Sequence, residues 1–403
     1  MTLGPQFGAV GRRRWSVAAL VLAVAVPLGA QSSRVFRDGN TWVEETTGTL
    51  PAGHEFRTFT DMGSVQVQGN ASQVSYVVRK RSNADNEDAA RKQFQQLRIT
   101  ATKVGDAVVL EGRLMGRTVN RMAADFVVQI PRLTQVVKAE TRGGALSLNS
   151  ISGTVFGTTG GGNVNVDDIS GPVKITSSGG NMQAGNVTSD LFLQSGGGNV
   201  SVERVTGQLF IKTGGGQVKI GTAGTTSVET GAGNIAMNQC NGDLHANSGG
   251  GNLNLGDVHG TVTASTGGGT VRLASAEGAV EVNTGGGAVE LMKVGQSAHV
   301  ETGGGPITVQ FVAGRGQYRD SYLHTAVGNV VVYLPRNLGV NVHASTELAS
   351  GPGIKSEFPG LGITSEGGQY GPKSMFGEGP LNGGGPLLRL RTTIGEIDIL
   401  RSQ

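Results

Sequence analysis

The 403-residue chain has few of the residues on which disulfides, large cores and most active sites depend. Its single cysteine, Cys240, excludes an intramolecular disulfide and a cluster of thiolate metal ligands. Aromatic residues make up 5% of the sequence and charged residues 16%, which argues against one large conventional core and against a charge-rich disordered chain. Proline is also scarce, with 12 residues, and glycine follows no strict three-residue period, so a collagen-like triple helix is excluded.

The N-terminus has the order of features that is typical of a secretory signal. Residues 12–14 are arginines, residues 17–26 are an apolar run, and Gly29 and Ala30 are small residues suited to cleavage. The alternative, a membrane anchor, needs roughly 20 apolar residues and fits less well. We therefore expect residues 1–30 to be a signal peptide and the chain to be exported to the periplasm, the cell surface or the medium.

Removal of residues 1–30 would also remove the net charge of the protein. The segment contains three arginines and no acid, which is the whole formal excess of +3. The mature chain would then be neutral, so nucleic acid is not an expected partner. The mature chain is also expected to have no membrane span.

What the chain has in abundance is glycine, with 68 residues, and these glycines are periodic. The last glycine of each cluster recurs every 18 residues, with one step of 17 between Gly216 and Gly233. The ten reference glycines are Gly144, Gly162, Gly180, Gly198, Gly216, Gly233, Gly251, Gly269, Gly287 and Gly305. Such constancy indicates a repeat architecture, and not a compositional bias.

Aligning the repeats on these glycines reveals two short strands in each unit. Residues two and four places after the glycine are apolar in every unit, as in Val200 and Val202, and the residue between them is mostly polar. A second alternating segment follows half a unit later, as in Leu209 and Ile211. We therefore predict an all-β fold: a parallel β-solenoid (β-helix) with about 18 residues per coil.

Three further columns follow from the alignment. A serine or threonine stands three places before every reference glycine and predicts a ladder of hydroxyls, and asparagines directly after several glycines predict a ladder of amides. The asparagines are Asn163, Asn181, Asn199, Asn234 and Asn252. Cys240 falls in a column that is otherwise apolar, which predicts a buried, inert thiol. The glycines themselves are expected at tight corners that need a positive φ or leave no room for a side chain.

The flanks differ from the repeats and suggest a division of the chain into five segments. Residues 31–135 are predicted to form a β-rich N-terminal cap with one helix at Asn86–Leu97, and residues 136–348 the solenoid. Residues 349–385 are rich in glycine and proline and are predicted to be a loop, and residues 386–403 to be strands that close the far end. The cap and the end of the solenoid share a strand, Pro-Arg, strand pattern at Pro131 and Pro335.

The sequence contains no strong signal for catalysis, a cofactor or a metal, and none is expected. The glycine clusters lack the corner aspartate of calcium-binding repeats, and no lysine and helix follow them as in a phosphate-binding loop. Glycan-cleaving enzymes on parallel β-helices are the main alternative, and an exposed pair of acids within about 10 Å, over a groove, would favour it. Glu281 and Glu301 lie on neighbouring coils but in different columns, and His245 and His299 share a column but are separated by three coils.

One outward column carries aromatic residues and is the predicted binding stripe. Phe192 and Phe210 lie on adjacent coils, and Phe156 lies two coils before Phe192. An exposed aromatic row on a flat sheet can stack on sugar rings or pack against a partner. Coverage of the row by the cap or by a loop is the alternative.

Several motifs resemble the bacterial putative-adhesin family, whose domain has no assigned function. They are FRTFTDMGSVQVQG from Phe56, DFVVQIPR from Asp125, the repeated TGGGNV units and the closing GGGPLLRLRTTIGEIDI, and together they span roughly Glu55 to Ile399. The resemblance implies an exported β-solenoid with no catalytic residues to carry over. We expect a non-enzymatic scaffold for an unidentified cell-envelope, glycan or protein ligand. The alternatives are a carbohydrate-active enzyme of the β-helix type and a purely structural envelope protein.

Overall fold

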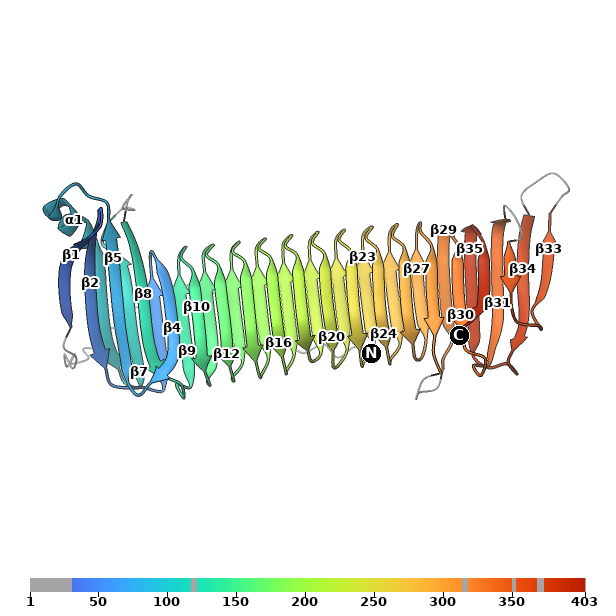
Figure 1. The fold of residues 1–403 in the computed structure, drawn as a ribbon, viewed down its shortest axis with the longest axis horizontal. Helices are drawn as coiled ribbons and strands as arrows, with labels where there is room; N and C mark the ends of the chain where they lie inside the picture. The colour runs from blue at the N-terminus through green and yellow to red at the C-terminus, as the bar shows by residue number, and fades with distance from the viewer. Residues whose placement is uncertain (1–30, 117–121, 314–317, 350–352, 368–372, 403) are drawn as a thin grey trace.

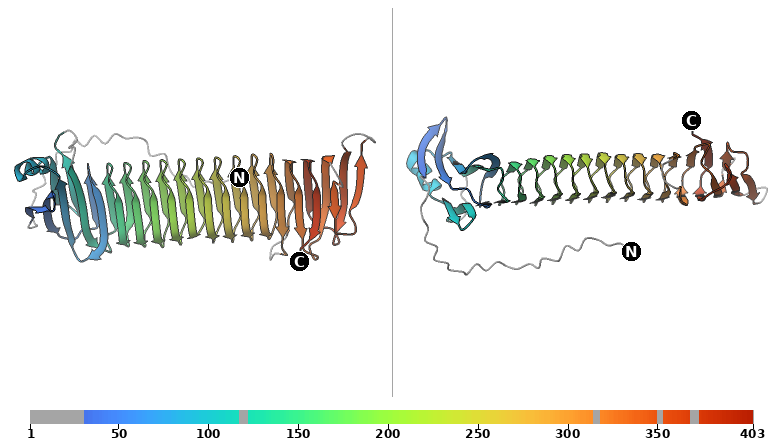
Figure 2. Two further views of the ribbon diagram at one scale, coloured as in Figure 1. Left: turned by 45° about the horizontal axis from the view of Figure 1, so that its top comes forward. Right: turned by 90° about the horizontal axis from the view of Figure 1, so that it is seen from below.

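The computed structural model describes residues 31–402 except 117–121, 314–317, 350–352 and 368–372, so the predicted signal peptide lies outside the described residues. The chain is 65% strand and 2% helix and forms two long parallel sheets of 18 strands each. The sheets face one another along an elongated rod (Figures 1 and 2). The predicted β-solenoid is confirmed.

The first sheet, sheet A, contains one strand of each coil. In spatial order its strands are β1 (Ser32–Asp38), β2 (Thr41–Leu50), β5 (Val74–Ser82), β8 (Met122–Pro131), β4 (Ser64–Ala71), β10 (Leu146–Ile151), β12 (Val164–Ile169), β14 (Met182–Val187), β16 (Val200–Val205), β18 (Val218–Ala223), β20 (Ile235–Cys240), β22 (Leu253–Val258), β24 (Val271–Ala276), β26 (Val289–Val294), β28 (Ile307–Phe311), β30 (Val330–Leu334), β36 (Ile397–Arg401) and β32 (Ile354–Ser356).

Sheet B contains the other strand of each coil. In the same direction its strands are β6 (Leu97–Val104), β7 (Ala107–Leu114), β3 (Glu55–Thr60), β9 (Val136–Thr141), β11 (Thr154–Thr159), β13 (Val173–Ser177), β15 (Leu191–Ser195), β17 (Leu209–Thr213), β19 (Thr226–Thr230), β21 (Leu244–Ser248), β23 (Val262–Thr266), β25 (Val280–Thr284), β27 (Ala298–Thr302), β29 (Ser321–Val327), β35 (Leu387–Ile394), β31 (Val340–Ala349), β34 (Lys373–Leu381) and β33 (Gly362–Glu366).

Equivalent residues of successive coils lie in register, as the periodicity predicts. Val200 pairs with Val218, and Val218 pairs with Ile235 across the one short step. The residue missing from that step is taken out of the corner between β18 and β19, so both strands keep their alignment. The inward residues of both sheets form one continuous apolar core, whose columns include the buried Cys240.

The reference glycines are required by close approach of backbones, and not by a positive φ. Within the described residues only the last of the ten, Gly305, has a positive φ, so the expectation of φ above zero is wrong for the other nine. A Cβ built on Gly198 would meet the carbonyl oxygen of Gly180, one coil earlier, and the same contact recurs from coil to coil. The middle glycine of the cluster, Gly197, has no atom within 4 Å of such a Cβ.

The predicted hydroxyl ladder is present, but it is buried. The Thr213 hydroxyl donates to the carbonyl oxygen of Gly198 at 2.8 Å and accepts from the N–H of Gly216 at 3.4 Å. The equivalent serine or threonine donates in the same way in each coil from Thr141 to Thr302. Each hydroxyl therefore ties a corner to the preceding coil and satisfies backbone groups that would otherwise be buried without a partner.

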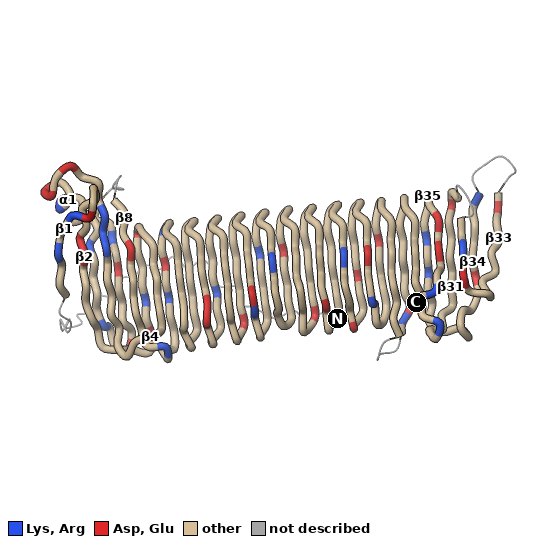
Figure 3. The backbone as a smooth tube through the Cα atoms, in the orientation of Figure 1, with Lys and Arg blue, Asp and Glu red and all other residues tan. Residues whose placement is uncertain are grey.

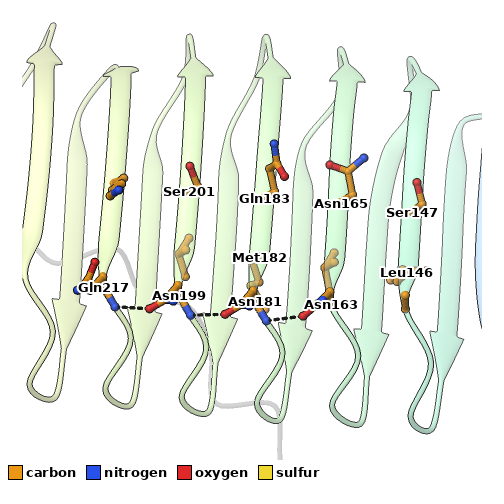
Figure 4. A pocket seen from close by; sticks show the side chains of 14 residues that line it. Leu146, Ser147, Asn163, Asn165, Asn181, Met182, Gln183, Asn199, Ser201 and Gln217 are labelled. Carbon is orange, nitrogen blue, oxygen red and sulfur yellow. Dashed lines mark hydrogen bonds between the residues drawn. The ribbon is translucent and has the colours of Figure 1, made fainter.

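The predicted amide ladder is also present, as a set of side-chain to backbone bonds on sheet A (Figure 4). The Oδ1 atom of Asn163 accepts from the N–H of Asn181 at 3.0 Å, and Asn181 accepts from Asn199 at 2.9 Å. Asn199 accepts in turn from Gln217 at 2.8 Å. The ladder resumes at Asn234 and Asn252.

The cap is smaller than predicted, because two coils within residues 31–135 belong to the solenoid. The coil of β3 and β4 pairs in parallel with β9 and β10, and the coil of β7 and β8 pairs in parallel with β3 and β4. These coils lack the glycine triplet, which is why the sequence does not reveal them. The remaining cap contains β1, β2, β5, β6 and the helix α1 (Glu87–Phe94), which Asn86 caps by accepting from the N–H of Ala89.

At both ends the chain inserts a terminal coil between two others. The β3–β4 coil lies between the β7–β8 and β9–β10 coils, and the β35–β36 coil lies between the β29–β30 and β31–β32 coils. The connections that pass over the inserted coils are the two Pro-Arg segments. Each begins with the same turn, in which Pro131 accepts from Thr134 at 3.0 Å and Pro335 accepts from Leu338 at 3.1 Å.

The C-terminal predictions need two corrections. Residues 386–403 do not close the far end, because β35 and β36 lie inside the array, as the red strands among orange ones in Figure 1 make visible. Residues 349–385 are not simply a loop, since they contain β32, β33 and β34. The strand signal is hidden because β33 is exposed at every position and so has no apolar alternation.

Candidate functional site

The predicted aromatic row is part of a longer outward column on sheet B, which we call the aromatic stripe. In register order its members are Lys138, Phe156, Lys174, Phe192 and Phe210. Because side chains alternate between the two faces of a strand, the buried residues on either side of each member force it outward. The three phenylalanines therefore lie in one column, as predicted.

The stripe has a defined local geometry. The rings of Phe192 and Phe210 stack with centroids 4.8 Å apart and an angle of 5° between their planes. The Nζ atom of Lys174 lies 5.0 Å from the Phe192 centroid, a cation–π contact that the aromatic signal alone does not reveal. Lys174 lies 18 residues before Phe192, so the register that places the phenylalanines also places it.

The stripe is accessible along the described part of the chain. Phe156, the phenylalanine nearest to the cap, is 40% exposed, and Phe192 and Phe210 are half-buried. The alternative that the cap covers the row is therefore wrong for Phe156. The flat sheet, with rings on one face, is a surface on which a planar or apolar group of a partner can stack.

The aromatic stripe carries one positive charge that no described ion pair neutralises, on Lys174. Lys138 pairs with Glu55 at 2.8 Å, and Lys212, beside Phe210, pairs with Glu229 at 2.7 Å. Lys174 forms no ion pair with any described residue. Figure 3 shows that charges are sparse along the body of the rod. A partner of the stripe would therefore meet one uncompensated ammonium group among three aromatic rings.

Beyond Phe210 the same column becomes polar. It continues through Ser227, His245, Thr263, Glu281 and His299 to Tyr322. His245 and His299 are three coils apart, as predicted, so they cannot share a metal ion. The described residues contain no group of three or more potential metal ligands.

The candidate acids Glu281 and Glu301 lie on the adjacent strands β25 and β27. Glu281 pairs in register with His299, and Glu301 pairs with Asn283, so the two carboxylates occupy different columns. Asp243 accepts hydrogen bonds from the N–H and the hydroxyl of Thr261, both at 2.8 Å, and these bonds lower its pKa. A carboxyl with a lowered pKa is poorly suited to act as the general acid.

The adjacent acids Asp167 and Asp168 bind the backbone and the Pro-Arg turn, respectively. Asp168 forms a two-point ion pair with Arg132 at 2.7 and 2.8 Å, and the hydrogen bonds from Arg132 lower the Asp168 pKa. The Asp167 carboxylate accepts from the N–H of Asn186 at 2.9 Å. Both carboxylates thus have structural partners.

Cys240 is buried, as the apolar column predicts, and burial raises the pKa of its thiol. The Sγ atom lies 3.1 Å from the carbonyl oxygen of Gly224 and 3.3 Å from that of Gly242. A thiol that is inaccessible and protonated is a weak nucleophile.

Comparisons with known proteins give a family and a set of distant structures. The family model Toastrack DUF4097 matches residues 60–238 and confirms the resemblance to a domain family of unknown function. No curated protein sequence matches the chain significantly. Within the described residues, no helix is both long and apolar enough to cross a membrane.

Three solved structures are similar at low identity. A putative cell adhesion protein from Clostridium sporogenes is 9% identical, covers 89% of this chain and 100% of its own, and has a TM-score of 0.21. A putative lipid binding protein from Parabacteroides distasonis is 12% identical over 74% of this chain and 98% of its own, with a TM-score of 0.25. A putative adhesin from Parabacteroides merdae is 13% identical over 75% of this chain and 100% of its own, with a TM-score of 0.26. At such TM-scores nothing about function follows from these structures.

Proposed function

From the match of residues 60–238 to the Toastrack DUF4097 family model, we propose that this β-solenoid is an exported, non-enzymatic interaction scaffold. It attaches through the aromatic stripe to a glycan or protein of the cell envelope. The proposal rests on one observation: the stacked Phe192 and Phe210 rings, with Lys174 beside them, remain partly exposed on sheet B.

A partly exposed stack favours binding for a physical reason. Rings that a protein uses only for its own stability are normally removed from water, whereas rings held in place by neighbours lose little freedom when a partner covers them. The hydroxyl ladder cannot serve this purpose, because its members are buried. The display of repeated hydroxyls to a partner is therefore not part of the proposal.

The test replaces Phe192 and Phe210 together by serine and measures attachment of the mature chain to immobilised envelope fractions and to a glycan array. Loss of both rings should lower the affinity about fivefold or more, since each aromatic contact contributes about 0.5–1.5 kcal/mol and the two together about 1–3 kcal/mol. Tyr333→Ser is the matched control, because Tyr333 is a half-buried aromatic residue on sheet A. Its affinity should equal that of the native protein.

Three outcomes would contradict the proposal. Unchanged attachment together with a lower melting temperature would make the stripe a packing feature, in support of a purely structural envelope protein. Release of sugars from any glycan by the purified chain would identify an enzyme. Export is tested separately: the mature protein should begin at Gln31, and an intact N-terminus on a protein retained in the cytoplasm would refute it.

A further inference from the structure

A second surface that the proposed function does not use lies on sheet A. It is a shallow hollow of about 570 Å³ along the corners of five consecutive coils (Figure 4). We call it the amide trough and define it by the carboxamides of Asn163, Asn165, Asn181, Gln183, Asn199 and Gln217. Sheet B, with the aromatic stripe, is the other face of the rod.

The amides of the ladder have a fixed orientation. A backbone N–H can be accepted only by the oxygen of a carboxamide, so the bonds from Asn181, Asn199 and Gln217 fix which end of each preceding side chain is oxygen. The Nδ2 groups of Asn163, Asn181 and Asn199 must therefore lie on the other side. None of the three donates a hydrogen bond to a described residue, and all three side chains are exposed.

The Nδ2 groups of the amide ladder form a periodic row of hydrogen-bond donors. Neighbouring coils are about 4.8 Å apart, so a pair of amide protons recurs at that interval along the rod. The oxygens are already occupied by the backbone. A matching ligand must therefore supply acceptors at regular intervals and lie along the rod axis, as a linear polymer does.

The charge of the amide trough further limits the class of ligand that it can bind. The one charged side chain in its lining is Lys219, which is exposed and forms no ion pair with any described residue, and no carboxylate lines it. We infer that the amide trough binds a linear acidic glycan, a polyuronate, whose carboxylate and hydroxyl oxygens accept from the Asn ladder and from Lys219.

The experiment uses Asn181→Asp in the mature chain and titrates it with oligogalacturonate in a calorimeter. The aspartate keeps an oxygen for the N–H of Asn199 but removes the donor and adds a negative charge, so affinity should fall at least tenfold with little change in melting temperature. Asn252→Asp is the matched control, because Asn252 makes the same bond, to Thr270 at 2.8 Å, but lies outside the trough. This control should bind like the native chain.

Two further variants separate binding in the amide trough from the stability of the amide ladder and from binding at the aromatic stripe. Gln183→Ala removes a lining amide that forms no hydrogen bond with a described residue, and it should weaken binding severalfold without unfolding the chain. The Phe192→Ser, Phe210→Ser double variant should bind oligogalacturonate normally, since its changes are on sheet B. Absence of oligogalacturonate binding by the native chain, equal loss in Asn252→Asp, or equal binding of neutral dextran would each overturn the inference.

Discussion

At the scale of single residues, the glycines of one cluster occupy positions with different steric requirements. The last glycine of each cluster lies against the carbonyl oxygen of its counterpart one coil earlier, whereas the middle glycine faces open space. The chain itself contains a natural substitution at the middle place, because Ala232 stands there between Gly231 and Gly233. A methyl group is thus accommodated at the middle position of the cluster. At the last position, the close backbone contacts leave no room for a methyl group.

This difference leads to a paired prediction. Gly198→Ala should lower the free energy of unfolding by about 1–3 kcal/mol, because the new Cβ must displace the Gly180 carbonyl. Gly197→Ala should leave stability unchanged or raise it slightly, since it restricts the unfolded chain. Urea denaturation followed by circular dichroism measures both. Equal destabilisation by the two variants would show that flexibility of the whole corner, and not close approach, requires glycine.

The residue columns were the most predictable part of the site, because strict periodicity turns sequence distance into spatial distance. Phe156, Phe192 and Phe210 could be aligned from the sequence alone, and so could the asparagines of the ladder. Lys174 has no aromatic signal, so the aromatic pattern alone does not identify it as a member of this column, although the register does. The burial of the hydroxyls follows from the alternation along each strand, since Thr159 lies on the same face as the buried Val155 whereas Thr158 points outward.

At the scale of elements, β3 is the strand that joins the N-terminal coils to the regular array. It carries Glu55, which forms ion pairs with Arg57 on the same strand and with Lys138 on β9. The hydrogen bond from Arg57, followed by that from Lys138, lowers the Glu55 pKa from 4.5 to about 2. The folded state thus favours the ionised carboxylate more than the unfolded chain does.

The sign of the resulting pH dependence follows directly. A carboxyl with a lowered folded pKa contributes stability above its unfolded value of 4.5, and this contribution is lost as the pH falls toward about 2. The contribution is at most about 3 kcal/mol, and solvent screening reduces it because Arg57 and Lys138 are about half exposed. Glu55→Gln should therefore show a smaller fall in melting temperature between pH 5 and pH 2 than the native chain.

The control for this prediction is Glu111→Gln, which removes a carboxylate that pairs with Arg113 at the surface of β7. Its melting temperature should fall with pH as steeply as that of the native protein. If Glu55→Gln shows the native pH dependence, the Glu55 ion pairs do not stabilise the junction.

Helices and strands that have a clear capping residue or apolar alternation in their sequence could be predicted, and those that lack such a pattern could not. The helix was expected at Asn86–Leu97 and spans Glu87–Phe94, because acids at its start and a capping asparagine identify it. The strands β32, β33 and β34 were missed, since their sequence is rich in glycine and their burial is irregular. Pairing partners stabilise them where local propensity does not.

At the scale of the whole molecule, the order of coils in space departs from the order in sequence at both ends. The inserted β35–β36 coil pairs with a coil on each side, so every strand of it has two partners. The sequence did not predict this, because hydrogen-bonded pairing between distant segments leaves no periodic trace. The resemblance of the two Pro-Arg segments was visible, but its meaning, a connection that passes over a coil, required the structure.

Two deletions should therefore have opposite effects. Removal of residues 252–269 takes out one regular coil and joins equivalent positions, so the rod should shorten by about 4.8 Å and stay folded with a slightly lower melting temperature. Removal of residues 387–403 leaves the β29–β30 and β31–β32 coils without their shared neighbour, and the melting temperature should fall by far more. X-ray scattering and thermal unfolding measure the two effects. Similar stability of the two variants would show that the inserted coil is dispensable.

The inserted terminal coil also determines how the rod resists mechanical force. A pull on the C-terminus acts first on β36, which runs parallel to β30 on one edge and to β32 on the other. When such a pull is directed along β36, the hydrogen bonds of both ladders are loaded in shear and must break together instead of one after another. An edge strand would peel away from a single neighbour, so β36, with two neighbours, resists a pull along its own direction more strongly than an edge strand does.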